Sequence, residues 1–333
     1  MDAVDAIRYL ARNEAKRLIP WDSREEGARR FSEGDRLATI DIHWDPRQKT
    51  YRVEGAGHEG HDNEDRMGFL CRYLKEKVLP YAEIAIKGVF PVQLHDSYTY
   101  LPNCKLENYD GVLTFSKNRG HAGPVLLPDP FQMTGYAGWF DPRLSDSVKW
   151  EDKKDAVFFT GTTTGDEDPA KNERVRACLW SLKNRSIADF RICKVAQMTQ
   201  EAFQSAVPEW REILSPPVPE SEHHKYKFLA NIRGNTCCWS RVPMIFKSKS
   251  LMFNVYHEDV AWYYPLMQEG THFVGCGSVE AIPQKRAHLL SNPTLCKVIV
   301  HNANRFYADF LGASQAALYV KELFENAMVL NAP

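Results

Sequence analysis

The five residues Gly-Thr-Thr-Thr-Gly at 161–165 could hold the phosphate groups of a ligand through their backbone. They follow the apolar run 156–159, which is typical of a buried strand, and they precede a segment with helical periodicity. Backbone N–H groups at such a strand-to-helix corner, here those of Gly161, Thr162 and Thr163, can donate hydrogen bonds to phosphate oxygens. The corner lacks the G-K-[ST] ending of an ATP-binding loop, so it indicates an anion site without naming the nucleotide.

Two arginines, Arg174 and Arg241, follow two corners of this kind. The second corner is the pair 234–235, which comes directly after the strand-like run 226–232. The carboxyl ends of neighbouring parallel strands lie side by side, and open α/β sheets bind ligands there. One guanidinium from each corner could clamp a diphosphate through paired hydrogen bonds. The alternative is that both are surface arginines, paired with Glu173 or with solvent.

An acidic triplet at 166–168 is a candidate metal site. Asp166 and Asp168 match the D-x-D spacing with which one class of sugar transferases chelates manganese and a nucleotide diphosphate. Pro169 follows at once, and the next helix is predicted to begin near Asn172. We therefore favour an exposed acidic turn ahead of a helix N-terminus, where negative charge is stabilising.

The histidines and cysteines do not form a recognisable metal motif. The segment 58–61, His-Glu-Gly-His, is one residue short of H-E-x-x-H, and 62–65 is predicted to be a solvated acidic turn. The pairs 223–224 and 237–238 offer soft ligands, but adjacent side chains rarely point at one ion, so no structural zinc is expected. None of the eight cysteines forms a C-x-x-C pair, and we expect free, mostly buried thiols.

The elements that must position these residues predict an α/β protein with two open-sheet domains. Strand-like and helix-like segments alternate on both sides of the polar stretch 141–154, which is the candidate domain boundary. We expect an N-terminal domain at 1–145, a second domain at 150–300 and C-terminal helices at 301–333 that pack back on the first. The predicted strands are 38–44, 50–53, 90–94, 111–115, 156–159, 190–195, 226–232 and 251–255.

The composition narrows the classes of partner. The 333 residues carry 42 Lys and Arg against 43 Asp and Glu, so no net positive field exists to gather a nucleic acid. No run approaches 18 consecutive apolar residues, which argues against a membrane span. The first residues lack the cationic and apolar blocks of a secretory leader. We expect a cytoplasmic protein, or one in the secretory lumen if a leader was removed.

Several motifs in register resemble glycosyltransferase family 90, the family of protein O-glucosyltransferases and fungal capsule-associated proteins. The segment 158–164 with 172–176 is similar to the family's F-R-G-x-x-T…R element, and 225–234 is similar to its K-Y-K-Y-L-x-N-x-x-G strand. The similarity runs in order from about residue 85 to residue 280. The matching segments are 90–97, 115–116, 126–129, 158–164, 172–176, 225–234, 241–253, 262–266 and 272–274.

This resemblance implies an inverting, metal-independent transferase with two Rossmann-like domains facing a central cleft, the GT-B type. It implies a UDP-sugar donor, with glucose or xylose as the sugar, and a glycan or glycoprotein acceptor. Neither a cofactor nor a metal is implied. By position, Asp96 would be the general base that deprotonates the acceptor hydroxyl. The residues implied to bind the donor are Gly161, Thr162, Thr163, Arg174, Gly234, Asn235, Ser240, Arg241 and Glu258.

The chain departs from the family pattern at three places. Thr160 stands where the F-R-G element has arginine, the text at 95–98 replaces a Gly-Asp-Trp-Pro-like sequence, and 234–241 is about one residue longer than in the animal enzymes. These departures favour a microbial or viral member that acts on a glycan. Two alternatives stay open: a metal-dependent transferase using Asp166 and Asp168, and a non-catalytic protein that stacks glycans on some of its 8 Trp and 14 Tyr residues.

Overall fold

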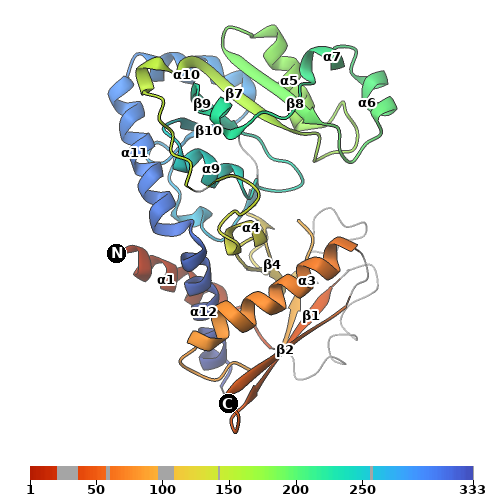
Figure 1. Cartoon of the computed structure of the whole chain (residues 1–333), viewed down its shortest axis with the longest axis vertical. Coiled ribbons are helices and arrows are strands. Elements are labelled where there is room, and N and C mark those ends of the chain that lie inside the picture. Colours follow the sequence, from red (N-terminus) through yellow and green to blue (C-terminus); the bar gives the residue numbers. More distant parts are fainter. Residues whose placement is uncertain (21–36, 58–60, 97–108, 142, 256–257, 333) are drawn as a thin grey trace. The chain divides into compact units, whose positions relative to one another are not determined.

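The computed structural model describes residues 1–20, 37–57, 61–96, 109–141, 143–255 and 258–332 (Figure 1). The chain forms two compact units, each built from separate stretches of sequence. Unit 1 consists of Met1–Gly135, Glu258–Tyr264 and Asp309–Pro333, and unit 2 consists of Tyr136–His257 and Pro265–Ala308.

Unit 1 contains a mixed five-stranded sheet of order β2-β1-β3-β4-β6. The predicted hairpin is confirmed: β1 pairs antiparallel with β2 and also with β3, while β3, β4 and β6 are parallel. Alternating burial along β1 puts Ala38, Ile40 and Ile42 in the core, as the period of a half-buried strand requires. The strands are β1 (Ala38–Asp45), β2 (Thr50–Gly57), β3 (Gly88–Val92), β4 (Leu113–Thr114) and β6 (Val125–Leu126), with β5 (Lys117–Asn118) outside the sheet.

The helices of unit 1 come from both ends of the chain. Asp2 caps the first helix by accepting a hydrogen bond from the Asp5 N–H, and an Arg8–Glu322 ion pair of 3.0 Å joins the first helix to the last. The helices are α1 (Ala3–Ala15), α3 (His61–Tyr73), α4 (Pro130–Met133) and α12 (Ala313–Leu330), with a π turn, η2 (Leu74–Val78), and a 3₁₀ turn, η3 (Leu79–Tyr81), after α3.

Unit 2 contains a parallel sheet of order β12-β10-β9-β7-β8. The inner strands β7, β9 and β10 contain apolar runs because both faces are covered, whereas burial alternates along the edge strand β8. The four strands predicted in this half are confirmed. The fold class is therefore α/β with parallel strands. The strands are β7 (Lys154–Thr162), β8 (Ala188–Lys194), β9 (Tyr226–Asn231), β10 (Leu251–Val255) and β12 (Val274–Cys276).

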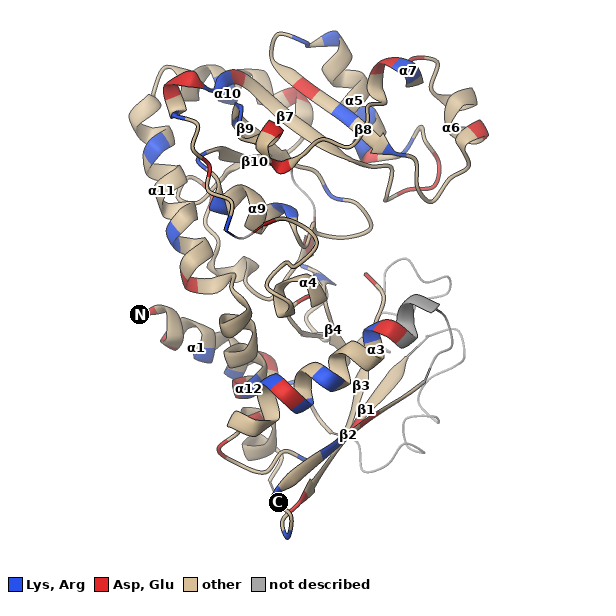
Figure 2. Cartoon of the chain, in the orientation of Figure 1, with Lys and Arg blue, Asp and Glu red and all other residues tan. Residues whose placement is uncertain are grey.

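Helices and short turns connect the strands of unit 2. Basic and acidic residues are interspersed along the helices rather than segregated by sign (Figure 2). Among the described residues, no helix is long and apolar enough to cross a bilayer. The helices are α5 (Glu173–Lys183), α6 (Gln200–Ala206), α7 (Trp210–Ile213), α8 (Glu220–His223), α9 (Arg241–Lys247), α10 (Ile282–Leu290) and α11 (Pro293–Phe310), with 3₁₀ turns η6 (Trp150–Asp152), η7 (Tyr264–Leu266) and η8 (Val279–Ala281).

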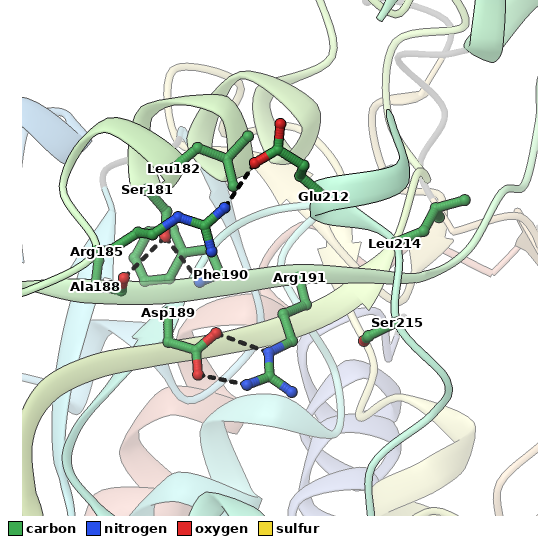
Figure 3. Close-up of a pocket in the computed structure, with 10 residues that line it drawn as sticks. All are labelled: Ser181, Leu182, Arg185, Ala188, Asp189, Phe190, Arg191, Glu212, Leu214 and Ser215. Atoms are coloured by element: carbon green, nitrogen blue, oxygen red, sulfur yellow. Dashed lines mark hydrogen bonds and ion pairs between the residues drawn. The ribbon is translucent and has the colours of Figure 1, made fainter. Parts of the chain in front are cut away.

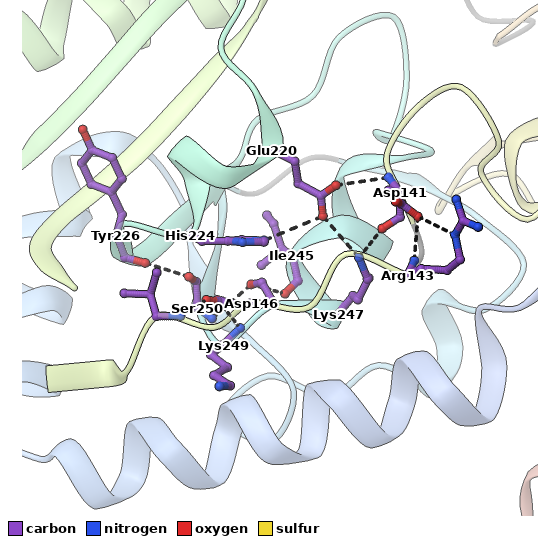
Figure 4. A network of polar contacts seen from close by, with 12 residues as sticks. Asp141, Arg143, Asp146, Glu220, His224, Tyr226, Ile245, Lys247, Lys249 and Ser250 are labelled. Carbon is purple, nitrogen blue, oxygen red and sulfur yellow. Dashed lines mark hydrogen bonds and ion pairs between the residues drawn. The ribbon is translucent and has the colours of Figure 1, made fainter. Parts of the chain in front are cut away.

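The stretch chosen from sequence as a linker is anchored in unit 2. The Asp146 carboxylate accepts a hydrogen bond from the Lys249 N–H at 2.8 Å (Figure 4) and another from Lys153 Nζ at 2.7 Å. The side chains of Asp146 and Lys153 are fully buried. Lys153 Nζ also donates to Ser250 Oγ at 3.2 Å. This buried ion pair fixes 146–153 within unit 2, which begins at Tyr136, whereas the sequence placed 1–145 in the first domain and started the second at 150.

A short stretch from the middle of the second predicted domain belongs to unit 1. Strand β11 (Asp259–Val260) pairs antiparallel with β5, and Trp262 Nε1 donates to Gln132 Oε1 at 2.8 Å. The helix α12, expected within the separate segment 301–333, is also part of unit 1. The units therefore differ from the predicted ranges at both ends of unit 2 and at 258–264.

Candidate functional site

The carboxyl ends of β7, β8 and β9 bring three loops to one edge of the unit 2 sheet. These strands are parallel neighbours, so their following residues must emerge on the same side. The three loops are 163–172 after β7, 195–199 after β8 and 232–240 after β9. Eight of the nine predicted donor residues, all except Glu258, lie in unit 2 on β7, in these loops, or on the helices that follow; Arg174 is on α5 and Arg241 on α9.

Thr163 ties the loop after β7 to the loop after β8. Its hydroxyl donates to the Ala196 carbonyl at 2.7 Å and accepts from the Ala196 N–H at 2.7 Å. Its own N–H donates to the Lys194 carbonyl at 3.1 Å, and the residue is fully buried. Thr163 was predicted to contact the donor, but its hydroxyl and its N–H form hydrogen bonds with the protein's own backbone.

Gly165 links all three loops. Its N–H lies 3.0 Å from both Gln197 Oε1 and Asn235 Oδ1, acceptors that come from the loops after β8 and β9. Its φ of +124° lies in a region that residues with a Cβ rarely adopt, which accounts for glycine at this point. Asn235, another residue predicted to contact the donor, therefore holds the loop after β7 in place.

Arg174, in the first turn of α5, joins the loops after β7 and β9. It is 7% exposed, and Asn172 caps its helix by accepting hydrogen bonds from the Arg174 and Val175 N–H groups. Its guanidinium donates to backbone carbonyls and to side chains of both loops, and no carboxylate is among its partners. The acceptors are the carbonyls of Thr162, Ile232 and Arg233, the hydroxyls of Thr162 and Thr164, and Cys238 Sγ.

Gly234 is a glycine because that guanidinium is packed against it. A Cβ at this position would lie 2.5 Å from Thr164 Oγ1 and 2.9 Å from Arg174 Nη2, closer than real Cβ atoms approach other atoms. At Gly161 a Cβ would lie 2.8 Å from the Phe159 ring. The two glycines of the predicted corners thus allow close packing between β7, β9 and Arg174.

Arg241 differs from Arg174 in having a donor without a partner. Its Nη2 donates to the Thr160 carbonyl and its guanidinium lies 4.6 Å from the centre of the Phe159 ring. Although the residue is partly exposed, its Nε is buried and has no hydrogen-bond partner among the described residues. Burial lowers the pKa of Arg241 to about 10, and the neighbouring Arg174 cation acts in the same direction. The side chain stays charged at neutral pH, and no carboxylate of the described residues pairs with it.

Three further buried polar atoms of unit 2 have no hydrogen-bond partner within the described part of the chain. They are Thr160 Oγ1, Asn231 Oδ1 and His223 Nδ1. The pKa of His223 is lowered to about 3, mainly by burial and in part by the charge of Arg241, which places the ring near the guanidinium. Buried polar groups are normally satisfied by protein, water or ligand, so each of these groups fits a polar neighbour such as water or a ligand. Sequence reasoning considered His223 only as a metal ligand and missed this position.

Ser240 and Glu258 complete the predicted donor set. Ser240 directly precedes α9, but its side chain makes no capping hydrogen bond there. Glu258 belongs to unit 1, where its Oε2 accepts from Asn118 Nδ2 at 3.0 Å and its carbonyl accepts from the Arg119 N–H at 2.7 Å. The pairing of β11 with β5 accounts for this placement, which no local pattern around 258 could reveal.

Asp96, the predicted base, lies at the end of the segment that follows β3 in unit 1. Its Oδ1 accepts from Arg66 Nη2 at 2.9 Å, and its carbonyl accepts from Ser116 Oγ at 2.6 Å. Arg66 also donates to the Leu94 carbonyl at 2.7 Å, so α3 fixes both the carboxylate and the backbone leading to it. The carboxyl side chain is 34% exposed, which leaves it accessible to a hydroxyl substrate.

The candidate metal ligands are engaged locally where they are described. Asp166 Oδ1 accepts from the Asp168 N–H at 2.9 Å, and Asp168 accepts from the Ala170 N–H at 3.0 Å and pairs with Lys171 at 3.3 Å. These are the contacts of an acidic turn before a helix. The described residues contain no group of three or more His, Cys, Asp and Glu that could hold a metal ion. The motif at 58–61 lies largely outside the described residues.

The described cysteines are free thiols, in agreement with the sequence-based expectation. They are Cys71, Cys178, Cys193, Cys237, Cys238, Cys276 and Cys296, whereas Cys104 lies outside the described residues.

A separate hollow of about 430 Å³ lies beside the start of β8 (Figure 3). Its charged side chains pair with one another: Asp189 with Arg191 at 2.6 Å, and Arg185 with Glu212 at 2.7 Å. It contains none of the predicted site residues and sits at the amino end of the strand, opposite the loops described above. The lining residues are Ser181, Leu182, Arg185, Ala188, Asp189, Phe190, Arg191, Glu212, Leu214 and Ser215.

Comparison with known proteins links the chain to sugar transferases. No family model matches, but the chain is 29% identical over 177 residues to an O-glucosyltransferase rumi homolog of Aedes aegypti, covering 51% of this chain and 40% of the relative. It is 25% identical over 226 residues to Protein O-glucosyltransferase 1 of Rattus norvegicus, covering 66% and 54%. The chain is similar to the protein O-glucosyltransferases. The resemblance to glycosyltransferase family 90 is thereby confirmed.

The sequence similarity covers only part of each relative. The chain spans about half the length of the curated O-glucosyltransferases it matches. A solved glycosyltransferase from Rickettsia africae covers 70% of this chain and 69% of its own at 14% identity, with a TM-score of 0.42, and this distant likeness carries no argument. The activity must therefore be argued from the site itself.

Proposed function

We propose that the protein is a glycosyltransferase that moves a sugar from a UDP-sugar to a hydroxyl group of a glycan or glycoprotein. Glucose is the first candidate for the sugar, since the relatives are named for it, and xylose is the second. The observation that carries the proposal is Arg241, a cation with a buried, unpartnered Nε at the carboxyl edge of a parallel sheet. A buried charge without a carboxylate partner is costly, so an anionic group is its natural complement.

Arg241 would stabilise the leaving diphosphate. As the bond between the sugar and the β-phosphate oxygen breaks, its electron pair stays on that oxygen and negative charge grows there. A guanidinium fixed by the Thr160 carbonyl and the Phe159 ring meets this charge without reorganising. We propose that no divalent ion is needed, because the positive charge of Arg241 and the nearby Arg174 supplies the same stabilisation.

Asp96 would accept the proton of the attacking hydroxyl. The acceptor oxygen bonds to the anomeric carbon from the face opposite the leaving UDP, which inverts the configuration, while its proton passes to the carboxylate. The Arg66 ion pair orients Asp96 for this step. We further propose that units 1 and 2 are the two Rossmann-like halves of a GT-B type enzyme, with the base on one half and the diphosphate site on the other.

Donor binding and transfer test the proposal separately. Calorimetric titration with UDP-glucose, UDP-xylose and UDP in EDTA should show nucleotide binding, and sugar transfer should persist in the chelator. The variant Asp96→Asn should lose about 10²–10⁴-fold in transfer rate with UDP affinity unchanged. Transfer by this variant at the wild-type rate would remove Asp96 from the mechanism.

Other outcomes point to the rival functions. Activity abolished by EDTA and restored by manganese would instead implicate Asp166 and Asp168. Glycan binding without any affinity for UDP-sugars would indicate a non-catalytic glycan-binding protein.

A further inference from the structure

Arg174 uses its whole guanidinium inside the protein. Nε donates to the carbonyls of Ile232 and Arg233 at 3.3 and 2.9 Å, and Nη1 donates to the Thr162 carbonyl at 3.1 Å and to Thr164 Oγ1 at 2.6 Å. Nη2 donates to the Ile232 carbonyl at 3.2 Å and to Cys238 Sγ at 3.1 Å. Each of the three nitrogens therefore has protein acceptors.

These acceptors come from the two segments that form the predicted donor corners. Residues 162–164 end β7 and begin the loop after it, while 232–238 begin the loop after β9. The carbonyls at these strand ends have left the ladder of the sheet and need donors. One planar fork of five N–H groups satisfies several of them at once, which a single ammonium could not do in the same geometry.

The packing around Arg174 leaves little space beside the fork. Gly234 lies so close to the guanidinium that a Cβ there would be 2.9 Å from Nη2 and 3.1 Å from Cζ. The guanidinium also lies 5.8 Å from the centre of the Phe159 ring, the same ring that Arg241 covers at 4.6 Å. Arg174 is thus enclosed between the two loops, whereas Arg241 retains a free buried donor.

We propose that Arg174 is a positioning residue: it holds segments 162–165 and 232–238 in register for the donor diphosphate, and Arg241 contacts that diphosphate. The proposal rests on the proposed function, because it names the role of Arg174 in the same site. It replaces a clamp of two equivalent arginines with one ligand-contacting arginine and one that acts through the backbone.

Hydrogen exchange of the free protein separates this role from direct contact. In Arg174→Gln and Arg174→Lys, amide exchange in 162–165 and 232–238 should accelerate about tenfold or more, since several charge-assisted hydrogen bonds are lost. Arg174→Lys keeps the charge but not the fork, so it should behave like Arg174→Gln. Arg241→Gln should leave the exchange of both segments unchanged. The matched control is Arg176→Gln, an exposed arginine two residues along α5.

UDP affinity completes the test. Both Arg174 variants and Arg241→Gln should bind UDP about tenfold more weakly or worse, but only the Arg174 variants should combine this loss with faster exchange. Weaker UDP binding by Arg174→Gln with wild-type exchange of both segments would overturn the proposal and make Arg174 a direct ligand. Wild-type exchange and affinity in Arg174→Lys would also overturn it, since charge alone would then suffice.

A second variant covers the case in which Arg174→Gln does not fold, and the exchange measurement covers the case in which UDP does not bind. If Arg174→Gln does not fold, Thr164→Val removes a single acceptor of the fork and should still speed exchange in 232–238; wild-type exchange in that variant would count against the proposal. If the wild-type protein does not bind UDP at all, the proposed function fails. The exchange of the free protein still decides whether Arg174 holds the two loops together.

Discussion

Two cations of unit 2, the buried Lys153 and the partly exposed Arg241 with its buried Nε, lie at opposite ends of β7 and have opposite surroundings. Lys153, just before the strand, is enclosed by the Asp146 carboxylate, the His224 carbonyl and Ser250 Oγ. Arg241, beside the far end of the strand, has the Thr160 carbonyl, the Phe159 ring and the Cys238 thiol as neighbours, and its Nε has no hydrogen-bond partner among the described residues. A buried cation whose donors are all matched stabilises the fold, whereas one with an unmatched donor is available to a ligand.

The largest effect should come from breaking the matched pair. Asp146→Ala leaves Lys153 buried without its carboxylate, and the free energy of unfolding should fall by about 3–5 kcal/mol. Urea denaturation followed by tryptophan fluorescence measures this. The control Asp155→Ala removes an exposed partner of Lys227 and should cost about 1 kcal/mol or less. Equal losses in the two variants would remove the contrast between buried and surface pairs.

The pH dependence of stability should report the buried ring beside Arg241. The pKa of His223 is about 3 in the folded state, below its ordinary value of 6.5, because burial disfavours the charged ring. The unfolded chain therefore binds a proton between pH 6.5 and 3 that the folded chain does not. Stability should fall with decreasing pH across this window, by about 1.4 kcal/mol per unit from this residue.

A pair of variants isolates that contribution. In His223→Leu the slope of unfolding free energy against pH should become shallower between pH 6.5 and the onset of acid unfolding. His288→Leu, which changes an exposed histidine, should keep the wild-type slope. An unchanged slope in His223→Leu would show that the ring is protonated in the folded protein.

Removing the unmatched cation should weaken the ligand rather than the fold. Arg241→Gln should reduce the free energy of UDP binding by about 1.5–3 kcal/mol, the usual contribution of a hydrogen bond to a charged group, while unfolding changes by about 1 kcal/mol. Calorimetry and urea denaturation measure the two quantities. Arg185→Gln, in the hollow beside β8, is the control and should leave UDP affinity unchanged. If Arg241→Gln instead greatly lowers the free energy of unfolding and leaves UDP affinity intact, Arg241 stabilises the fold and does not bind the ligand.

The smallest effect should come from the hydroxyl groups of β7 and its loop. Thr160→Val removes a buried hydroxyl without a partner among the described residues, so the unfolding free energy should stay within about 0.5 kcal/mol or rise. Thr163→Val removes a hydroxyl that both donates to and accepts from Ala196 and should cost about 1–2 kcal/mol. Similar costs at both positions would indicate that the Thr160 hydroxyl is already satisfied.

Local patterns predicted the strands of unit 2 well because buried parallel strands are short apolar runs between turns. The same patterns predicted a strand-to-helix corner at the end of β7 and put Arg174 on the helix that follows it. They could not distinguish Arg174 from Arg241, since the difference lies in carbonyls of residues 232 and 233, almost sixty positions away from Arg174. A local sequence pattern cannot predict hydrogen-bond partners that lie so far apart in the sequence.

The polar stretch 141–154 shows the opposite error. Its charges and proline are typical of an exposed linker, yet Asp146 and Lys153 are buried together and Asp146 also binds the Lys249 N–H. The pairing of β11 with β5, which places Glu258 in unit 1, likewise joins positions about 140 residues apart. Composition indicates polarity, but only the tertiary partners decide whether a polar residue is solvated or enclosed.

The two ends of the chain meet in unit 1, and this has a consequence for the order of events on the ribosome. The core of unit 1 includes α12, where Phe324 packs edge-on against Phe90 of β3 with ring centres 4.8 Å apart. The N-terminal strands are made first but must wait for the last residues before that core can close. Unit 2 needs nothing beyond Ala308. Synthesis should thus complete unit 2 while unit 1, which carries Asp96, still awaits α12.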